Sequence, residues 1–283
     1  MTPQDFDYFK SLLKERSGLI LSDDKGYLIE SRLGPIVKKA NLESITALVE
    51  ELKKAGSEDL RNQVTEAMTT NESFFFRDKL PFNHFKEAML PHILETRKLK
   101  RSFRVWCAAS STGQEPYSLA ITLQEMGDQI QGWRPEIVAT DLSSEVLEKA
   151  QSGLYSQFEV QRGLAAPLLV KYFEQVGSLW QISSTIRGMV QYRQYNLLDS
   201  FVPLGTFDIV FCRNVLIYFD QKTKIDVLNR IAAQTAPDGF LVLGAAETIV
   251  GLTDAFVPVE GRRGMFQKAT AENAGILKNS AVG

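Results

Sequence analysis

Cysteine and histidine are almost absent from this chain, with two of each among its 283 residues. Cys107 and Cys212 both fall inside short apolar runs, where a buried thiol that packs as a small hydrophobic group is favoured over a disulfide or a nucleophile. His84 and His92 are eight residues apart, with no third ligand type nearby. Because a protein metal centre needs several such ligands, the sequence predicts neither a disulfide framework nor a metal site.

Long apolar runs and a strong net charge are missing as well. No run approaches the roughly 18 apolar residues expected of a membrane-spanning helix, and the first residues, MTPQDFDYF, lack the basic and apolar regions of a signal peptide. We therefore expect a cytoplasmic protein without a membrane span. The formal net charge is -2, which favours neither nucleic acid nor an anionic membrane as the main partner.

The two familiar glycine motifs for phosphate, G-x-G-x-x-G and G-K-[ST], do not occur. The stretch from Phe103 to Ala120 nevertheless predicts a buried strand, a loop of small residues containing Gly113, and a helix with Pro116 in its first turn. This unit binds nucleotide-like cofactors in open α/β sheets, and free amides at the helix start favour an electron-rich group. An ordinary connection between strand and helix remains the alternative on this stretch alone.

A second strand, Ile137 to Thr140, is followed at once by Asp141, with Ser143 and Gly153 placed to begin and end the next helix. An acid at this position, at the tip of the second strand and about 30 residues after the first strand, is where open α/β folds bind ribose hydroxyls. Asp141 could instead form a turn. Its combination with the glycine loop favours a ligand.

The first 68 residues predict a small helical bundle. Thr2 and Pro3 are typical of a helix start, and apolar residues recur at helical spacing in three segments, around residues 6–13, 42–52 and 60–68. Ser57 is expected to cap the last of these helices. A basic stretch lies between the first two of these segments and contains Lys25, Arg32, Lys38 and Lys39. It is either a solvated face or a docking surface for an acidic partner.

The remainder alternates strand and helix, which indicates a doubly wound sheet. Further strands are predicted at Ile209–Cys212 and Phe240–Gly244, with a helix from Gln221 and a turn at 237–239 between them. Leu179–Ile182 and Met189–Tyr195 fit a small antiparallel insertion better than a βαβ unit. We expect three parts: a helical domain at 1–68, an α/β domain at 69–270 with its insertion at about 176–195, and a mobile tail at 271–283.

The segment TTNESFFFRD, Thr69 to Asp78, joins three phenylalanines to polar residues on both sides. A hydrophobic plug between two domains would explain the phenylalanines. It would not explain why Asn71, Ser73 and Arg77 stand where they could all face one site.

Five motifs taken together resemble the chemotaxis receptor methyltransferases, the family that esterifies receptor glutamates with S-adenosylmethionine. They occur in the family's order and approximate spacing, and read TTNESFFFRD, ASSTGQEPYSLA, ATDLSSEVLEKAQSGLY, NLLD and FCRNVLIYFD. The resemblance covers nearly the whole chain. It implies an α/β fold, with a Rossmann-like class I methyltransferase sheet carrying a small antiparallel β insertion, plus an N-terminal all-α helical domain.

The resemblance also implies roles for individual residues. Residues expected to bind the cofactor are Asn71, Ser73, Arg77, Gly113, Glu115, Asp141, Asn196, Leu197, Arg213 and Asn214. Arg77 and Tyr218 are expected at the reacting centre, Tyr218 beside the transferred methyl. The loop often reads GEEP in the family and GQEP here, which changes the local charge at Gln114 and leaves Glu115 in place.

The activity that the resemblance implies is a protein-glutamate O-methyltransferase, a monomeric cytoplasmic enzyme of chemotaxis signalling that leaves S-adenosylhomocysteine as product. Its expected partners are the cytoplasmic helices of methyl-accepting receptors. The rival readings are a class I methyltransferase for a small molecule, which would not need the N-terminal bundle, and a non-catalytic adaptor. Relatives that tether a receptor tail carry a longer, glycine-rich connection where this chain has only Gly177, so we expect direct recognition of the receptor helices.

Overall fold

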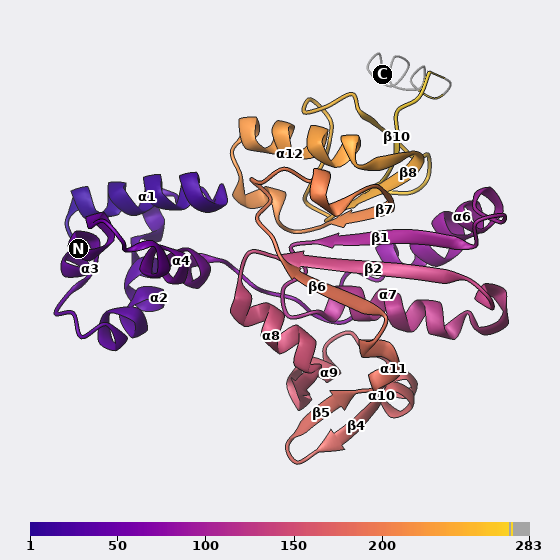
Figure 1. Ribbon diagram of the computed structural model, residues 1–283, viewed down its shortest axis with the longest axis horizontal. Coiled ribbons are helices and arrows are strands. Elements are labelled where there is room, and N and C mark those ends of the chain that lie inside the picture. The colour runs from indigo at the N-terminus through magenta and orange to yellow at the C-terminus, as the bar shows by residue number, and fades with distance from the viewer. Residues whose placement is uncertain (272, 274–283) are drawn as a thin grey trace. The chain divides into compact units, whose positions relative to one another are not determined.

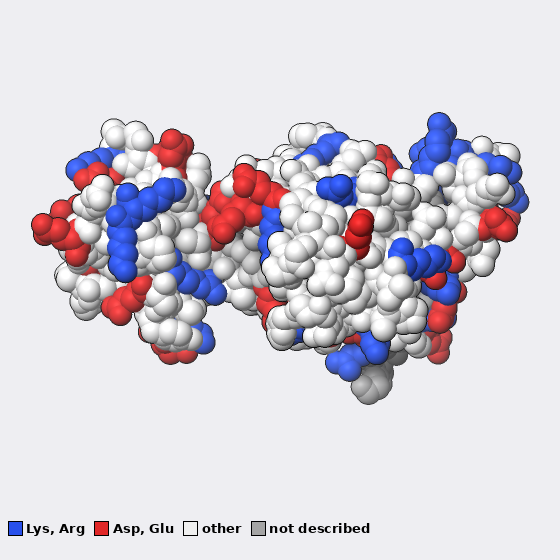
Figure 2. All heavy atoms as spheres, turned by 90° about the horizontal axis from the view of Figure 1, so that it is seen from below, with Lys and Arg blue, Asp and Glu red and all other residues white. Residues whose placement is uncertain are grey.

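The computed structural model describes residues 1–271 and 273, and the chain divides by its contacts into two units (Figure 1). The first unit contains residues 1–70 and 218–223, and the second contains 71–217 and the described residues from 224 on. Apart from Ala271 and Asn273, the tail expected to be mobile lies outside the described residues. Within the part of the chain described, no helix is long and apolar enough to cross a membrane. Both units carry acidic and basic side chains on the face shown in Figure 2.

Four helices make up most of the first unit: α1 (Pro3–Ser17), α2 (Gly26–Lys39), α3 (Ile45–Lys53) and α4 (Glu58–Met68). As expected, Thr2 begins α1, and it does so in a capping box with Asp5. The apolar positions of the helices form one buried core that includes Phe9, Leu33 and Leu48. The all-α character predicted for this region is confirmed.

Helix α2 is a difference from the sequence prediction, which placed only a basic stretch between two helices. Its buried residues are Ile29, Leu33 and Val37, spaced four apart, and Pro35 lies inside the helix. Proline removes one intrahelical hydrogen bond and normally disfavours a helix interior. Packing of the apolar face outweighs that cost here.

Two polar residues of this unit have roles other than those expected. The hydroxyl of Ser57 donates to the carbonyl of Glu51 (2.6 Å) and does not cap α4. Arg32 donates to the carbonyls of Met68 (2.6 Å) and Thr69 (2.9 Å), at the carboxyl end of α4. The guanidinium of Arg32 therefore holds the end of α4 within the chain.

The second unit is built on a seven-stranded sheet with the order β6-β2-β1-β7-β8-β10-β9. The strands are β1 (Ser102–Ala108), β2 (Arg134–Asp141), β6 (Val190–Gln194), β7 (Phe207–Cys212), β8 (Thr235–Leu243), β9 (Phe256–Pro258) and β10 (Met265–Lys268). The first five run parallel, and β10 pairs antiparallel with β8 and β9. Every residue of the central strand β7 is buried, as expected of a parallel strand covered on both faces.

The helices of this unit follow the expected alternation. They are α5 (Leu80–His84), a π-helical turn (Phe85–Met89), α6 (Leu90–Thr96), α7 (Gln114–Glu125), α8 (Ser144–Ser152), α9 (Gln157–Gln161), α10 (Ala166–Tyr172), α11 (Ser184–Arg187) and α12 (Gln221–Ala233). Short 3-10 turns occur at 127–130, 202–204 and 216–218, and a further one lies at 23–25 in the first unit. Side chains of α5, the π-helical turn, α6 and α7 share one core with Val105, Cys107 and Ile209 of the sheet. Both cysteines are buried and free, as predicted.

The antiparallel insertion exists, but its predicted composition is wrong. Leu179–Ile182 (β5) pairs with β3 (Leu154–Ser156) and β4 (Phe173–Val176) in a separate three-stranded sheet. Met189–Tyr195 instead supplies β6, which pairs parallel with β2 at the edge of the main sheet. Alternating burial along a strand does not reveal its partner. The connection from β4 to β5 is a short turn at Gly177, the feature from which direct recognition of the receptor helices is expected.

The segment Pro237-Asp238-Gly239 is also placed differently from the prediction. It lies inside β8, at an irregularity where Phe207 pairs with Thr235 and Ile209 pairs with Phe240. A bulge of this kind accommodates proline and glycine within a strand. The Asp238 carboxylate binds Arg97 and lies 3.1 Å from Nε2 of His92, so hydrogen bonding lowers its pKa to about 2.

Candidate functional site

The loop between β1 and α7 is drawn against the end of β2 by Asp141. Its backbone takes positive φ angles at Ala109 (58°), Ser111 (51°) and Gly113 (91°). The amide of Ser111 donates to Oδ2 of Asp141 (2.8 Å), and the amide of Ser143 donates to Oδ1 (3.0 Å). Asp141 is buried, and a carboxylate has about four acceptor positions. Asp141 therefore fixes the loop to the end of β2 through both of its oxygens.

Gly113 is required by packing within the protein. A Cβ atom at this position would lie 2.6 Å from the hydroxyl of Tyr192 and 2.9 Å from Cβ of Ala150. Its φ of 91° is also one that other residues rarely adopt. The close approach seen at Gly113 is thus to Tyr192, whereas the sequence argument expected room for a ligand.

Arg213 connects three segments at the carboxyl end of β7. Its Nη1 donates to Oε2 of Glu115 (2.7 Å), and its Nη2 donates to Oδ2 of Asp78 (2.7 Å) and to the carbonyl of Arg77 (2.9 Å). The Arg213 side chain is 1% exposed. Burial raises the pKa of Glu115 above its usual value, an effect that the charge of Arg213 opposes. Glu115 and Arg213, both predicted site residues, are thereby brought into one ionic network.

The TTNESFFFRD motif is anchored in the second unit by its middle phenylalanine. Phe75 is fully buried, with its ring centroid 5.1 Å from that of Tyr155 and 5.4 Å from that of Phe173. The carbonyl of Asn71 accepts a hydrogen bond from Oγ of Ser111 (2.8 Å), so the motif reaches the glycine loop.

Arg77 and Ser73 of the same motif stand apart from these contacts. The guanidinium of Arg77 lies over the ring of Phe74 and donates to the carbonyl of Glu72 (2.8 Å). Ser73 lies between Glu72 and Phe74 in the chain, and its side chain is partly exposed.

Asn196 and Leu197 follow β6 and lie beside the end of β2. The amide of Tyr195 donates to the carbonyl of Asp141 (2.8 Å), and Oδ1 of Asn196 accepts from the amide of Leu198 (3.0 Å). The carbonyl of Leu197 accepts from Arg230 (2.8 Å). These contacts bring Asn196 and Asp141 to the same edge of the sheet.

Glu247 is a site residue that the sequence prediction missed. Oε2 of Glu247 accepts from the amides of Asn214 (2.8 Å) and Gly244 (2.7 Å), and Oε1 accepts from the amide of Val215 (3.0 Å). Asn214 has a φ of 60°, an angle that costs energy in most residues. Glu247 thus holds the turn that presents Arg213 and Asn214, and no local motif signals this, since 33 positions separate it from Asn214.

Tyr218 belongs to the first unit, whereas the other predicted site residues belong to the second. It ends the 3-10 turn at 216–218, and its carbonyl accepts from the amide of Ile20 (2.9 Å).

Two buried polar atoms at the sheet edge have no hydrogen-bond partner among the described residues. They are Oγ of Ser110, in the glycine loop, and Nε of Arg213. Because buried polar groups are nearly always paired, these atoms fit a site that accepts a polar ligand such as a nucleoside with an amino-acid tail. Across residues 1–271 and 273, no group of histidine, cysteine or acidic side chains could hold a metal ion.

The role of Glu247 can be tested by Glu247→Gln. The substitution turns one acceptor into an amide donor that faces backbone amides, so the free energy of unfolding should fall by about 1–3 kcal/mol. Urea denaturation measures the loss. The control is Glu260→Gln, at an exposed position, which should change stability by less than about 0.5 kcal/mol. Equal stability of the two variants would remove Glu247 from this role.

Comparison with known proteins assigns the chain to a family over almost its whole length. Residues 4–69 match the CheR methyltransferase all-alpha domain, and residues 71–265 match the CheR methyltransferase SAM binding domain. The chain is 39% identical over 271 residues to a chemotaxis protein methyltransferase of Vibrio parahaemolyticus, covering 95% of this chain and 98% of that protein. It is 40% identical to the chemotaxis protein methyltransferase Cher2 of Pseudomonas putida (94% and 98% covered).

A third relative, the chemotaxis protein methyltransferase of Salmonella typhimurium, is 34% identical, with 87% of this chain and 84% of that protein covered. The resemblance and the fold class predicted from the sequence are confirmed, and so is the cofactor, S-adenosylmethionine. On these matches, the chain belongs to the CheR methyltransferase family.

Proposed function

We propose that this enzyme transfers the methyl group of S-adenosylmethionine to glutamate carboxylates on the cytoplasmic helices of chemotaxis receptors, forming methyl esters. Family membership supports methyl transfer in chemotaxis. The acceptor is inferred from the chemistry at the sheet edge. An alcohol or amine acceptor would need a base to remove its proton, whereas a glutamate, with an ordinary pKa of about 4.3, is already ionised at neutral pH.

The observation that carries this inference is that the carboxylates at the sheet edge are already engaged. Glu115 and Asp78 bind Arg213, while Asp141 and Glu247 accept from backbone amides. Hydrogen bonds to the charged form of a carboxylate favour that form, so a carboxylate held by such contacts is a weak general base. The arrangement therefore suits an acceptor, such as an ionised carboxylate, that is nucleophilic without a general base to remove a proton.

The cofactor would be held by residues from both ends of the β2 to β6 connection. Asp141 would accept from the ribose hydroxyls, Asn196 and Leu197 would flank the adenine, and Glu115 would face the ammonium of the amino-acid tail. Asn71, Ser73, Gly113, Arg213 and Asn214 would complete the site, with Arg213 fixing Glu115. The bound cofactor supplies a methyl group activated by the sulfonium. The protein's task is then to align the acceptor with it and to exclude water.

Arg77 and Tyr218 are proposed to act at the reacting centre. A guanidinium can grip a carboxylate in a bidentate pair, so Arg77 would hold the carboxylate of the acceptor or of the cofactor. Tyr218 would donate a hydrogen bond from its phenol and position the reactants.

The defining test is the chemistry of the product. The purified chain, given S-adenosylmethionine labelled in its methyl group and a receptor cytoplasmic fragment, should make a labelled receptor that releases volatile methanol in alkali, as an ester does. A receptor fragment with its acceptor glutamates changed to alanine is the control. Label that is stable to alkali would contradict ester formation.

Tyr218→Phe tests the proposed position of the tyrosine. Removing one hydroxyl should lower kcat at saturating cofactor by about 10- to 100-fold, in the range expected when one interaction made in the transition state is lost. The Kd for S-adenosylhomocysteine should stay unchanged. A full rate in Tyr218→Phe would place the reacting centre elsewhere.

Glu115→Gln tests the pH dependence of cofactor binding. Burial raises the pKa of Glu115, so its proton binds at a higher pH than on a surface glutamate, and the affinity for S-adenosylhomocysteine should fall as the pH drops from 7 to 5. Glu115→Gln should bind more weakly at pH 7 and show a flatter profile, as calorimetry can measure. Glu148→Gln, on the exposed face of α8, should keep the wild-type profile. Identical profiles in both variants would exclude Glu115.

Lys38 and Lys39, both exposed at the end of α2, are proposed to meet an acidic receptor surface. Changing both to glutamate should lower the rate of receptor methylation at least fivefold and flatten its salt dependence, because exposed charges are screened within about 10 Å at 0.1 M salt. Affinity for S-adenosylhomocysteine should not change. The double variant of Lys98 and Lys100 to glutamate makes the same charge change in the second unit, and an equal loss there would refute a specific contact.

A further inference from the structure

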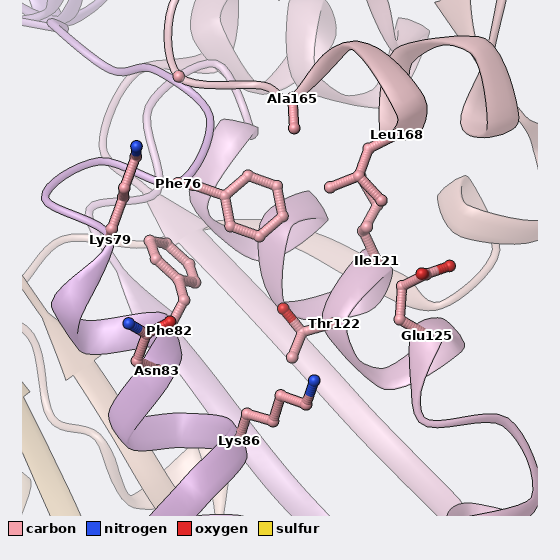
Figure 3. Close-up of a pocket in the computed structure, with 11 residues that line it drawn as sticks. Phe76, Lys79, Phe82, Asn83, Lys86, Ile121, Thr122, Glu125, Ala165 and Leu168 are labelled. Carbon is pink, nitrogen blue, oxygen red and sulfur yellow. The ribbon is translucent and has the colours of Figure 1, made fainter.

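A pocket of about 370 Å³ lies outside the cofactor site, within the second unit (Figure 3). Its walls come from the turn at 76–79, from α5 and the π-helical turn, from α7, and from the segment 163–168 before and within α10. None of the residues proposed to bind the cofactor is among those that line it. Its volume falls in the range of about 300–1,000 Å³ that is typical of sites for small organic ligands.

Part of the pocket is lined by apolar side chains. The rings of Phe76 and Phe82 meet edge to face, with centroids 5.3 Å apart. Figure 3 shows them on one side of the pocket, with Ile121 from α7 and Leu168 from α10 on the other. A flat hydrocarbon body would be buried between these groups.

The polar groups at the rim are mainly donors. Lys79 and Lys86 line the pocket, and neither forms an ion pair within residues 1–271 and 273. The pKa of Glu125 is lowered mainly by Lys171 and Tyr172 and, to a smaller degree, by the charge of Lys86. Asn83 adds an exposed amide. The only acid on the rim, Glu125, is already bound by Lys171 (2.6 Å) and by the hydroxyl of Tyr172. The rim therefore favours an anionic group.

The backbone around the pocket departs from regular structure at several points. Phe76 and Lys79 have φ angles of 50° and 49°, and Lys86 lies in the π-helical turn Phe85–Met89. Residues in such conformations, and π-helical turns, are concentrated at ligand-binding and switch regions. Gly163 fixes the opposite wall, because a Cβ atom there would lie 1.9 Å from the carbonyl of Phe75. The pocket is thus held open by the fold itself.

From these observations we propose that the pocket binds a small organic acid with a flat apolar body, with its carboxylate against Lys79 or Lys86. The bound acid also strengthens cofactor binding. The turn at 76–79 connects the two sites, since Phe76 and Lys79 line the pocket while Asp78 and the carbonyl of Arg77 bind Arg213, the partner of Glu115. An acid that stabilises this turn stabilises the arrangement that holds Glu115.

The test uses three probes with one ring system: naphthalene-2-carboxylate, naphthalene-2-carboxamide and 2-naphthylmethylamine. Calorimetry on the full chain at pH 7 should show the carboxylate binding at least 10-fold more tightly than the amide, and the amine most weakly. Equal affinities for the carboxylate and the amide would overturn the proposal.

Two kinds of variant locate the binding. Lys79→Gln with Lys86→Gln should reduce carboxylate affinity to that of the amide, and Ala165→Trp should fill the pocket and abolish binding of both probes. Lys100→Gln, at an exposed position outside the pocket, should bind like the wild type. Thermal midpoints establish that each variant is folded. Unchanged binding in the double lysine variant would place the acid elsewhere, even if Ala165→Trp failed to fold.

The coupling is measured separately, by the Kd for S-adenosylhomocysteine at rising concentrations of naphthalene-2-carboxylate. Coupled sites predict that this Kd falls and then reaches a plateau, at least threefold below its starting value, and that the effect is reciprocal. A Kd that rises without limit would mean competition for one site, and a constant Kd would exclude the coupling.

Discussion

The contacts of the buried guanidinium of Arg213 are the interaction on which the arrangement at the carboxyl end of β7 depends. A charge that is 1% exposed is tolerated only when its counter-charges and hydrogen bonds are in place. Glu115 and Asp78 meet that requirement from two segments distant in sequence, the start of α7 and the turn at 76–79. The TTNESFFFRD motif, the glycine loop and the end of β7 therefore form one electrostatic unit, and the loss of any member would leave a buried charge uncompensated.

The rest of the edge is organised by carboxylates that bind backbone amides. Asp141 fixes the glycine loop to β2, and Glu247 fixes the turn after β7 to the end of β8. A carboxylate that accepts amide hydrogen bonds stabilises backbone conformations that the chain would otherwise avoid. The positive φ angles of Ser111 and Asn214 occur at these two points. The hydrogen bonds to Asp141 and Glu247 thus compensate the backbone strain at Ser111 and Asn214.

The sequence predicted what depends on local pattern and failed where distant contacts decide. Apolar runs located β1, β2, β7 and β8, and capping residues located the ends of α1 and α8. Helix α2 was missed because Pro35 contradicts a helix locally, while packing against α3 and α4 favours it. The role of Glu247 depends on amides 33 positions away. The close packing of Gly113 against Tyr192 likewise depends on a residue distant in sequence.

Strand β6 was predicted to belong to the insertion, but it belongs to the main sheet. Its position there explains how residues on either side of the insertion are held together. Everything between Asp141 and Val190, including α8 and the three-stranded sheet, lies in the single crossover from β2 to β6. Both ends of that crossover are fixed, because β6 pairs parallel with β2, with Asp141 opposite Gln194, and the amide of Tyr195 binds the carbonyl of Asp141. A crossover can lengthen at modest entropic cost, since loop closure depends only weakly on length. Asp141 and Asn196 therefore keep their places at the same edge of the sheet whatever the length of the insertion between them.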